Sequence, residues 1–295
     1  MTRARTALDD RTVLITGAAR GIGEHLARRL HAANANVALV GLEPERLQRL
    51  RTELGDRVAV FDADVTDATA ITAAADATAE LFGGIDIAVA NAGVAFVGAL
   101  ATAPVDHVER TLQVNLMGVW RTDRAVLPHL IRSKGYLLNI SFLAAAGHMP
   151  LMGAYTASKA GSEALTDALR MEMRPAGVAV GCAYFGFIDT DLVRGSLRNP
   201  AGAAAYALAP SFLSTSLPVT AATDALEKGI ARRSARIWAP RFVGPALAAR
   251  GLLQPLVELG LRLRPNGLSA ALALADDQHN LTQHDTILGA AGNGD

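Results

Sequence analysis

The chain of 295 residues has little cysteine, little lysine and no excess of charge of either sign. Cys182 is the only cysteine, which excludes an intrachain disulfide and a zinc site of several cysteines, and no metal site is predicted. The 28 basic and 28 acidic side chains cancel, whereas a domain that binds nucleic acid usually carries a basic excess, so no nucleic acid partner is expected. The only lysines are Lys134, Lys159 and Lys228, and a lysine within a motif therefore carries more weight than usual.

Long apolar runs are also missing, although 51% of the residues are apolar. The two longest stretches without Asp, Glu, Lys or Arg are Gly135–Ser158 and Asn199–Thr223, and both contain prolines, glycines and polar residues. A membrane-spanning helix needs about 20 consecutive apolar residues. The opening Met1–Arg11 carries three arginines without an apolar stretch behind them, which is not typical of a secretory signal. We expect a soluble, cytoplasmic protein.

Short apolar runs alternate with longer amphipathic segments through most of the chain. The predicted strands are Thr12–Thr16, Asn36–Val40, Arg57–Asp62, Ile85–Ala90, Tyr136–Ile140, Val178–Ala183 and Arg236–Trp238. The predicted helices are Ile22–Ala33, Glu43–Leu54, Asp67–Phe82, Pro104–Arg132, Ala154–Met173 and Ala221–Arg232. This alternation predicts an α/β fold in three layers, with a central parallel sheet of seven strands covered on both faces, within one domain over residues 1–240.

Two regions depart from this alternation. Arg194–Pro218 shows little periodicity and is interpreted as a long connection, the kind that often forms a lid or a binding loop. Residues 241–295 are interpreted as an extension without a core of its own, in which Phe242–Arg264 is apolar and arginine-rich with leucines at roughly helical spacing. Beyond Ala275 the extension becomes polar and glycine-rich, which predicts fraying.

A glycine-rich turn follows the first predicted strand and opens the first predicted helix. Its sequence runs Thr16-Gly17-Ala18-Ala19-Arg20-Gly21-Ile22-Gly23. Glycines at such a place permit a tight turn and let the backbone approach a pyrophosphate, which then lies on the positive end of the helix. The turn therefore predicts dinucleotide binding in a doubly wound Rossmann fold.

Four motifs in order resemble the short-chain dehydrogenase/reductase family. They are the Gly-x3-Gly-x-Gly turn, Asn91-Ala92-Gly93, Asn115 and Tyr155-x3-Lys159, and the resemblance covers about residues 10–240. It implies a nicotinamide cofactor and assembly as a homodimer or homotetramer.

The resemblance also implies the residues that hold the cofactor. Asp64 and Val65 would contact the adenine, Asn91 would support the sheet beside the cofactor, and Thr190 would bind the nicotinamide carboxamide. Each has a plain alternative: Asp64 as a turn residue and Thr190 as the cap of a short helix. The full predicted set is Gly17, Arg20, Gly21, Ile22, Gly23, Leu42, Glu43, Asp64, Val65, Asn91, Ala92, Gly93, Tyr155, Lys159, Gly186, Ile188 and Thr190.

The choice between NAD(H) and NADP(H) depends on the end of the second predicted strand. An acidic residue there hydrogen-bonds the adenosine ribose and repels a 2′-phosphate, whereas an arginine attracts the phosphate. Glu43 lies slightly late but is acidic, and Arg20 in the glycine turn acts in the opposite sense. We favour NAD(H) and leave NADP(H) open.

Tyr155 and Lys159 are the predicted catalytic pair. Residues four apart on a helix share a face, and a neighbouring ammonium favours the phenolate form of a tyrosine. The resemblance implies that Tyr155 exchanges a proton with the substrate oxygen and that Lys159 lowers the pKa of Tyr155 and holds the nicotinamide ribose. It further implies that Asn115 anchors a water of the proton relay, the alternative being an asparagine that is simply satisfied in the core.

The fourth catalytic member departs from the family. A serine thirteen residues before the tyrosine usually binds the substrate oxygen, and here that position holds Phe142, preceded by Ser141. Successive strand residues face opposite sides of a sheet, so Ser141 replaces the serine only if a bulge or a longer loop turns it inward. Ser141 nevertheless remains the candidate catalytic serine.

Apolar side chains are predicted to crowd the substrate end. The candidate pocket residues are Phe142, Met149, Met152, Phe185 and Phe187, while Phe96 is expected in the core. For Phe142 and Phe185, ordinary core packing is an equal alternative. The pocket predicts a bulky hydrophobic ketone or alcohol as substrate.

Two functions follow. The first is an NAD(P)-dependent alcohol dehydrogenase or ketoreductase, and the alternative is a dinucleotide-binding sensor or scaffold whose active site is blocked by Phe142. The extension has three alternatives as well: packing on its own domain, a contact between subunits, or a membrane surface, the last being the least favoured.

Overall fold

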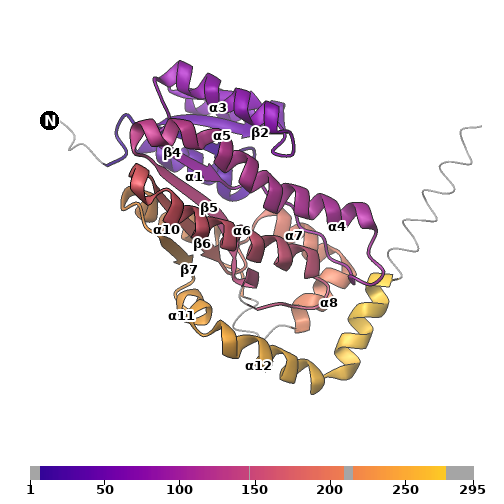
Figure 1. Cartoon of the computed structure of the whole chain (residues 1–295). Helices are drawn as coiled ribbons and strands as arrows, with labels where there is room; N and C mark the ends of the chain where they lie inside the picture. Colours follow the sequence, from indigo (N-terminus) through magenta and orange to yellow (C-terminus); the bar gives the residue numbers. More distant parts are fainter. Residues whose placement is uncertain (1–6, 146, 209–214, 277–295) are drawn as a thin grey trace, which may run out of the picture.

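The computed structural model describes residues 7–145, 147–208 and 215–276. Seven parallel strands form one sheet in the order β3-β2-β1-β4-β5-β6-β7, which confirms the predicted α/β fold (Figure 1). The strands are β1 (Thr12–Thr16), β2 (Asn36–Gly41), β3 (Val58–Asp62), β4 (Ile87–Ala90), β5 (Tyr136–Phe142), β6 (Ala179–Phe185) and β7 (Arg236–Ala239). The terminal segment beyond residue 276, for which the sequence predicts fraying, lies outside the described residues.

The sheet is buried on both faces, which is why its strands are apolar throughout rather than alternating. Along β1, Val13 and Ile15 pack in one core cluster and Leu14 in the other. The covering helices are α1 (Gly21–Ala32), α2 (Pro44–Leu54) and α10 (Val219–Ala231) on one face, and α3 (Ala68–Phe82), α5 (Gly118–Ser133) and α6 (Gly153–Glu172) on the other. Short 3₁₀ turns follow β5 (Leu143–Ala145) and α6 (Arg174–Ala176).

The long helix predicted over Pro104–Arg132 is interrupted. The structure has α4 (Val105–Leu112), then a π-helical turn over Gln113–Met117, then α5. A π-turn carries an extra residue and is often found at functional sites. Here it directs Asn115 at the loop after β4, where the side chain amide bonds the backbone of Val94.

The prediction of a long irregular connection over Arg194–Pro218 is wrong for its first half, which is helical. Thr190 caps α7 (Asp191–Arg198) by accepting a hydrogen bond from the backbone of Val193 at 3.5 Å. Asn199 accepts one from the backbone of Gly202 at 3.1 Å, at the start of α8 (Pro200–Leu208). An asparagine followed by a proline is a common start of a helix. The sequence of α8 behind this start is rich in alanine, however, and shows no apolar periodicity. Residues 209–214 lie outside the described residues.

The C-terminal extension packs on its own domain at several places. Helix α11 (Val243–Ala248) joins a cluster with β6, and the helical residues 265–276 pack on α8. Between them runs α12 (Arg250–Arg262), so that the extension curves around the lower edge of the molecule in Figure 1. The Arg250 guanidinium binds both carboxylate oxygens of Glu163 on α6, at 2.6 and 3.0 Å.

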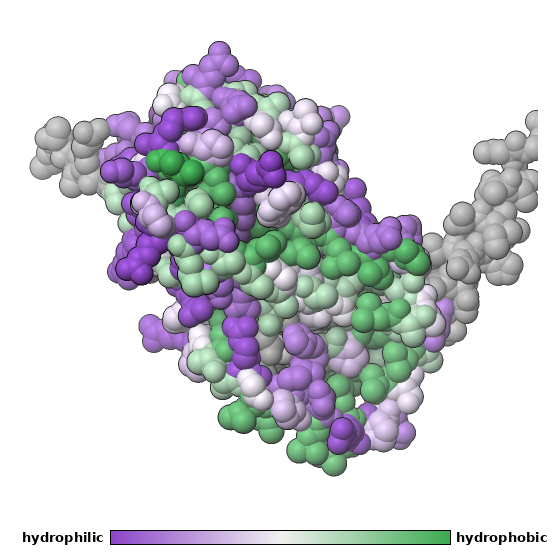
Figure 2. Space-filling view, in the orientation of Figure 1, coloured by the Kyte–Doolittle hydropathy of each residue, from purple (hydrophilic) through white to green (hydrophobic). Residues whose placement is uncertain are grey.

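One face of α12 remains exposed. It carries Leu252, Leu256, Leu259 and Leu263, which are 53–75% exposed and lie where hydrophobic side chains gather along the lower edge in Figure 2. None of the helices in the described ranges is both long and apolar enough to cross a membrane. Self-association into dimers or tetramers and contact of the extension with a membrane surface stay predictions, which sedimentation and vesicle flotation of the full chain would test.

The Arg250–Glu163 pair predicts a measurable contribution of the extension to stability. Glu163 is 4% exposed, and Arg250→Ala would leave its carboxylate buried without its cation. Because an unpaired buried charge is costly, we expect the free energy of unfolding to fall by about 1–3 kcal/mol in urea titrations. The control is Arg262→Ala, at an exposed position in the same extension. An equal effect of the two substitutions would contradict the account.

Candidate active site

A cleft of about 950 Å³ opens at the carboxyl ends of the strands. The sheet order reverses there, since β1 lies between β2 and β4, and such switch points are where open α/β sheets bind ligands. Most of the residues predicted to hold a cofactor line this cleft: Gly17, Arg20, Gly21, Ile22, Leu42, Glu43, Asp64, Val65, Asn91, Ala92, Gly93, Tyr155, Lys159, Gly186, Ile188 and Thr190. Gly23 lies just behind the lining.

The glycine turn has the shape of a phosphate cradle. Gly17 and Gly21 have φ angles of +65° and +57°, and a Cβ on Gly17 would stand 2.8 Å from the Cα of Ala92. A Cβ on Gly23 would overlap the carbonyl oxygen of Gly17. No side chain of the described chain caps the start of α1, so its first N–H groups are open to an anion. The turn therefore fits a pyrophosphate.

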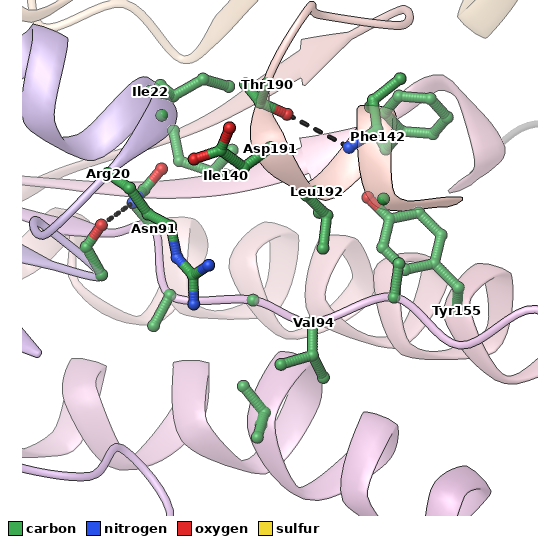
Figure 3. A pocket seen from close by; sticks show the side chains of 18 of the residues that line it. Arg20, Ile22, Asn91, Val94, Ile140, Phe142, Tyr155, Thr190, Asp191 and Leu192 are labelled. Carbon is green, nitrogen blue, oxygen red and sulfur yellow. Dashed lines mark hydrogen bonds between the residues drawn. The ribbon is translucent and has the colours of Figure 1, made fainter. Parts of the chain in front are cut away.

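Asn91 holds this turn from the neighbouring strand. Its Nδ2 donates to the carbonyl oxygens of Thr16 and Gly17, at 2.9 and 3.1 Å. The side chain lies at the same end of the cleft as Arg20 (Figure 3). Asn91 thus occupies the supporting position that its motif predicts.

The two residues that argue for opposite cofactors form an ion pair. Arg20 Nε lies 2.9 Å from Glu43 Oε1, and Arg46 Nε lies 3.1 Å from Glu43 Oε2. Leu42 beside them is 53% exposed. The carboxylate is therefore held at the rim of the cleft by two guanidinium groups.

Asp64 and Thr190 each have the local role that was the alternative, and their contacts with a cofactor stay predictions. Asp64 Oδ1 accepts a hydrogen bond from the backbone of Thr66 at 2.8 Å, as a turn residue does, and its other oxygen lies 3.6 Å from Arg110. Thr190 caps α7. Both nevertheless line the cleft, so the turn holds Asp64 and the helix cap holds Thr190 at the site.

Tyr155 and Lys159 lie one turn apart on α6, and both line the cleft. Lys159 Nζ donates to the carbonyl oxygen of Ile140 at 2.9 Å and stands 5.8 Å from the centre of the Tyr155 ring. Burial raises the pKa of the Tyr155 phenol above its usual value and lowers the pKa of Lys159 to about 8. Burial of the phenol accounts for the raised pKa of Tyr155, and the expected lowering of this pKa by Lys159 is not found.

Asn115 is fully buried, and its amide is occupied. Oδ1 accepts from the backbone N–H of Val94 at 2.8 Å, and Nδ2 donates to the carbonyl of Val94 at 2.9 Å and to Ser158 Oγ at 3.1 Å. The structure thus shows the satisfied core asparagine that was the alternative. Anchoring of a relay water stays a prediction.

The ring of Phe142, rather than a hydroxyl, lies beside Tyr155. β5 continues in regular register, with Ser141 opposite Tyr184 and Phe142 opposite Phe185, so no bulge turns Ser141. Ser141 borders the cleft, but its Oγ donates to the carbonyl of Lys159 at 3.2 Å. The Phe142 and Tyr155 ring centres are 5.7 Å apart (Figure 3). A catalytic role for Ser141 stays a prediction that this hydrogen bond disfavours.

A second cavity of about 30 Å³ adjoins Tyr155 at the substrate end, and some of the predicted pocket residues line it. Phe142, Met152 and Phe187 line it. Met149 lines neither cavity. Phe185 borders the cleft, but its side chain is 1% exposed and packs in the core, so we assign it to the core. Phe96 was expected in the core and instead lines the cleft.

Sequence reasoning missed lining residues on the two unforeseen helices. Leu192 and Val193 come from α7, and Tyr206 comes from α8. The helix start at Asn199-Pro200 was the available signal, and Tyr206 is the single aromatic residue in the alanine-rich segment behind it. Val94, directly after the Asn91-Ala92-Gly93 motif, was missed as well.

Comparisons with known proteins agree with this arrangement. A rat protein (Rattus norvegicus), dehydrogenase/reductase SDR family member 7B, is 33% identical over 201 residues, which cover 65% of this chain and 62% of that protein. A short-chain dehydrogenase/reductase from Burkholderia phymatum, solved in complex with NAD, superposes with a TM-score of 0.74 at 25% identity, covering 84% of this chain and 96% of that one. An alcohol dehydrogenase from Thermococcus sibiricus, complexed with 5-hydroxy-NADP, gives a TM-score of 0.59 at 31% identity, over 61% and 77% of the two chains.

The family model for short chain dehydrogenases matches residues 11–200, from β1 to the start of α8, and the chain continues beyond this match. The matched region includes the glycine turn, Asn91, Asn115, Tyr155 and Lys159. This chain belongs to the short chain dehydrogenase family.

Proposed function

We propose that the chain is an NAD(P)-dependent oxidoreductase that interconverts a secondary alcohol and a ketone on a bulky hydrophobic substrate. One observation carries the proposal: Tyr155 lines both the large cleft and the small apolar cavity beside it. A single phenol is thus placed between a cleft that fits a dinucleotide and a small cavity with an apolar lining. Relatives of similar fold have been solved with NAD and with 5-hydroxy-NADP.

The residues of the cleft fit a nicotinamide dinucleotide. The N–H groups at the start of α1 would hold the pyrophosphate, Glu43 would bind the adenosine ribose, and Lys159 would bind the nicotinamide ribose. When bound, the cofactor supplies the donor or acceptor of a hydride. The orientation of the cofactor follows from the predicted roles of Asp64 and Thr190.

Tyr155 is suited to give a proton to a carbonyl oxygen. Because burial raises its pKa, the phenol is protonated at neutral pH. Lys159 has a pKa of about 8 and still carries a charge at pH 7, and its ammonium lies close enough to stabilise the phenolate that remains. In the oxidative direction the same groups would take the proton from an alcohol.

The apolar lining favours a hydrophobic substrate. Phe142, Phe187 and Leu192 line the small cavity beside Tyr155, and the described lining of this cavity contains no charged side chain. Charged substrates would lose their hydration there without a compensating partner.

The second candidate is a sensor or scaffold that binds a dinucleotide without turnover. The ring of Phe142 against Tyr155 is the observation that favours it. Calorimetry with NADH beside a turnover assay separates the two, because the sensor binds NADH and reduces no ketone, with or without Phe142→Ser.

Replacement of the phenol tests the catalytic assignment. We expect Tyr155→Phe to lower kcat/KM for ketone reduction by about 10²–10⁴-fold, the usual contribution of general acid catalysis, and to leave the affinity for NADH within a few-fold. The measurement follows loss of the reduced nicotinamide absorbance with cyclic, aromatic and long-chain ketones.

Lys159→Ala should also lose most of the activity, whereas Lys228→Ala, at an exposed position on α10, should keep it. The proposal fails if no ketone is reduced by the native chain, or if Tyr155→Phe reduces ketones at the native rate.

The cofactor preference is proposed to be NAD(H), set by Glu43. Glu43→Gln would remove the charge that repels a 2′-phosphate and would release Arg20 and Arg46 from their ion pairs. We expect the ratio of the NADPH and NADH dissociation constants to shift toward NADPH by about 10–100-fold, or about 1.4–2.8 kcal/mol. Fluorescence titration of both cofactors measures it.

The matched control is Glu45→Gln on the same helix, where the carboxylate is 91% exposed and lies 3.9 Å from Arg49. Tighter binding of NADPH than of NADH by the native chain, or equal ratios for Glu43→Gln and Glu45→Gln, would contradict the assignment.

A further inference from the structure

The small cavity at the substrate end lies between two tyrosines. Tyr155 lines it from α6 and Tyr206 lines it from α8, with Phe142 and Phe187 in the same lining. Its volume of about 30 Å³ exceeds the ~10–15 Å³ that a single water needs, so it has room for a small polar group such as a carbonyl oxygen.

The hydroxyl of Tyr206 is buried in this place without a partner. It makes no hydrogen bond to any residue that the structure describes. A buried polar group left unpaired is costly, and such groups in native proteins call for a specific explanation. The ring cannot easily turn away, since its centre lies 4.0 Å from that of Phe187 at an interplanar angle of 38°.

Three serines of the described chain near Tyr155 are already engaged. Ser141 donates to the carbonyl of Lys159, Ser158 to the carbonyl of Tyr155, and Ser196, in the lining of the small cavity, to the carbonyl of Leu192. The charge of Tyr155 contributes to raising the pKa of Tyr206, after burial, which places the two phenols within electrostatic reach. Tyr206 is therefore protonated and remains a free donor.

We propose that Tyr206 donates a hydrogen bond to the carbonyl oxygen of the substrate, from α8, in place of the serine that the family carries at the position of Phe142. The proposal rests on the oxidoreductase function above. During reduction the carbonyl carbon would receive the hydride that bound NAD(P)H supplies, leaving NAD(P)⁺, and the oxygen would take the proton of Tyr155, while Tyr206 would keep its proton and stabilise the negative charge that develops on the oxygen. The product is the secondary alcohol, and Tyr155 is left as phenolate.

The same arrangement assigns the substrate class and a role for the extension. The rings of Tyr155, Phe142, Phe187 and Tyr206 follow one another at centre distances of 5.7, 5.2 and 4.0 Å, which favours a flat cyclic or aromatic ketone. Next to the cavity, α8 also packs through Ala201 and Ala205 against residues 271–275 of the extension. The extension thus holds the helix that presents the Tyr206 hydroxyl.

The test measures binding rather than turnover. Tyr206→Phe removes the hydroxyl and keeps the ring, and the probes are cyclohexanone and acetophenone, each paired with the hydrocarbon in which a methylidene group replaces the oxygen, methylenecyclohexane and α-methylstyrene. In ligand-observed NMR titrations of the full chain with NAD⁺ present, we expect Tyr206→Phe to weaken the ketones about 2–10-fold, the value of one hydrogen bond, and to leave the hydrocarbons unchanged.

Rescue distinguishes a donor from a merely structural tyrosine. Phe142→Ser, added to Tyr206→Phe, should restore the preference for ketone over hydrocarbon, and kcat/KM for reduction should fall about 10²–10³-fold in Tyr206→Phe and recover in the double variant. Equal loss of ketone and hydrocarbon, no loss of either, or no ketone binding to the native chain would overturn the proposal.

Failure of the oxidoreductase proposal can be distinguished from failure of the Tyr206 proposal. If the chain reduces no ketone while Tyr206→Phe still weakens ketone binding selectively, the oxidoreductase proposal fails and the carbonyl site stands. If reduction requires Tyr155 but Tyr206→Phe does not change ketone binding, the oxidoreductase proposal stands and the carbonyl site at Tyr206 fails.

Discussion

The site depends on a pair of hydrogen bonds that lock the end of β5 to α6. Lys159 donates from its ammonium to the carbonyl of Ile140, and its own backbone carbonyl accepts from Ser141. One residue of the helix is thus bound twice to neighbouring residues of the strand. Further along the strand, Asn139 donates to Asp123 on α5 and to Thr166 on α6, so the strand is tied to both helices that cover it. These bonds fix where Tyr155 stands relative to the cleft.

The same lock accounts for the unusual substrate end. Ser141 donates its hydroxyl to α6, which disfavours a role at the substrate, and regular pairing of β5 with β6 places Phe142 beside Tyr155. The binding of the substrate oxygen, for which the family uses a serine at the position of Phe142, must then come from another element or be absent. The row of aromatic rings that ends at Tyr206 leads to α8, whose position is secured by the extension. In this view, the part of the chain beyond the family match and the phenylalanine at position 142 both shape the same site.

The sequence predicts the parts of the molecule that local chemistry dictates. The seven parallel strands, the glycine turn and the placement of Tyr155 and Lys159 on one helix follow from apolar periodicity and from residues with few alternatives, and the structure has them where expected. It does not predict what depends on contacts between distant segments. The π-turn at Asn115 is accompanied by bonds to the distant Val94, and α8 lacks an amphipathic pattern because its exposed positions Ala203 and Ala207 hold alanine just as its buried positions Ala201 and Ala205 do. The pKa of Tyr155 was expected to fall through Lys159 and rises instead, because the depth of burial is a property of the folded chain.

The claim that a dinucleotide cleft and an apolar carbonyl site meet at Tyr155 is tested most directly by a crystal structure of the full chain with NADH bound. The account predicts the pyrophosphate at the first turn of α1 beside Gly21, and the nicotinamide next to Tyr155 and Thr190, with Phe142 still against the tyrosine. A dinucleotide bound outside the cleft, or a nicotinamide kept away from Tyr155 by the ring of Phe142, would contradict it.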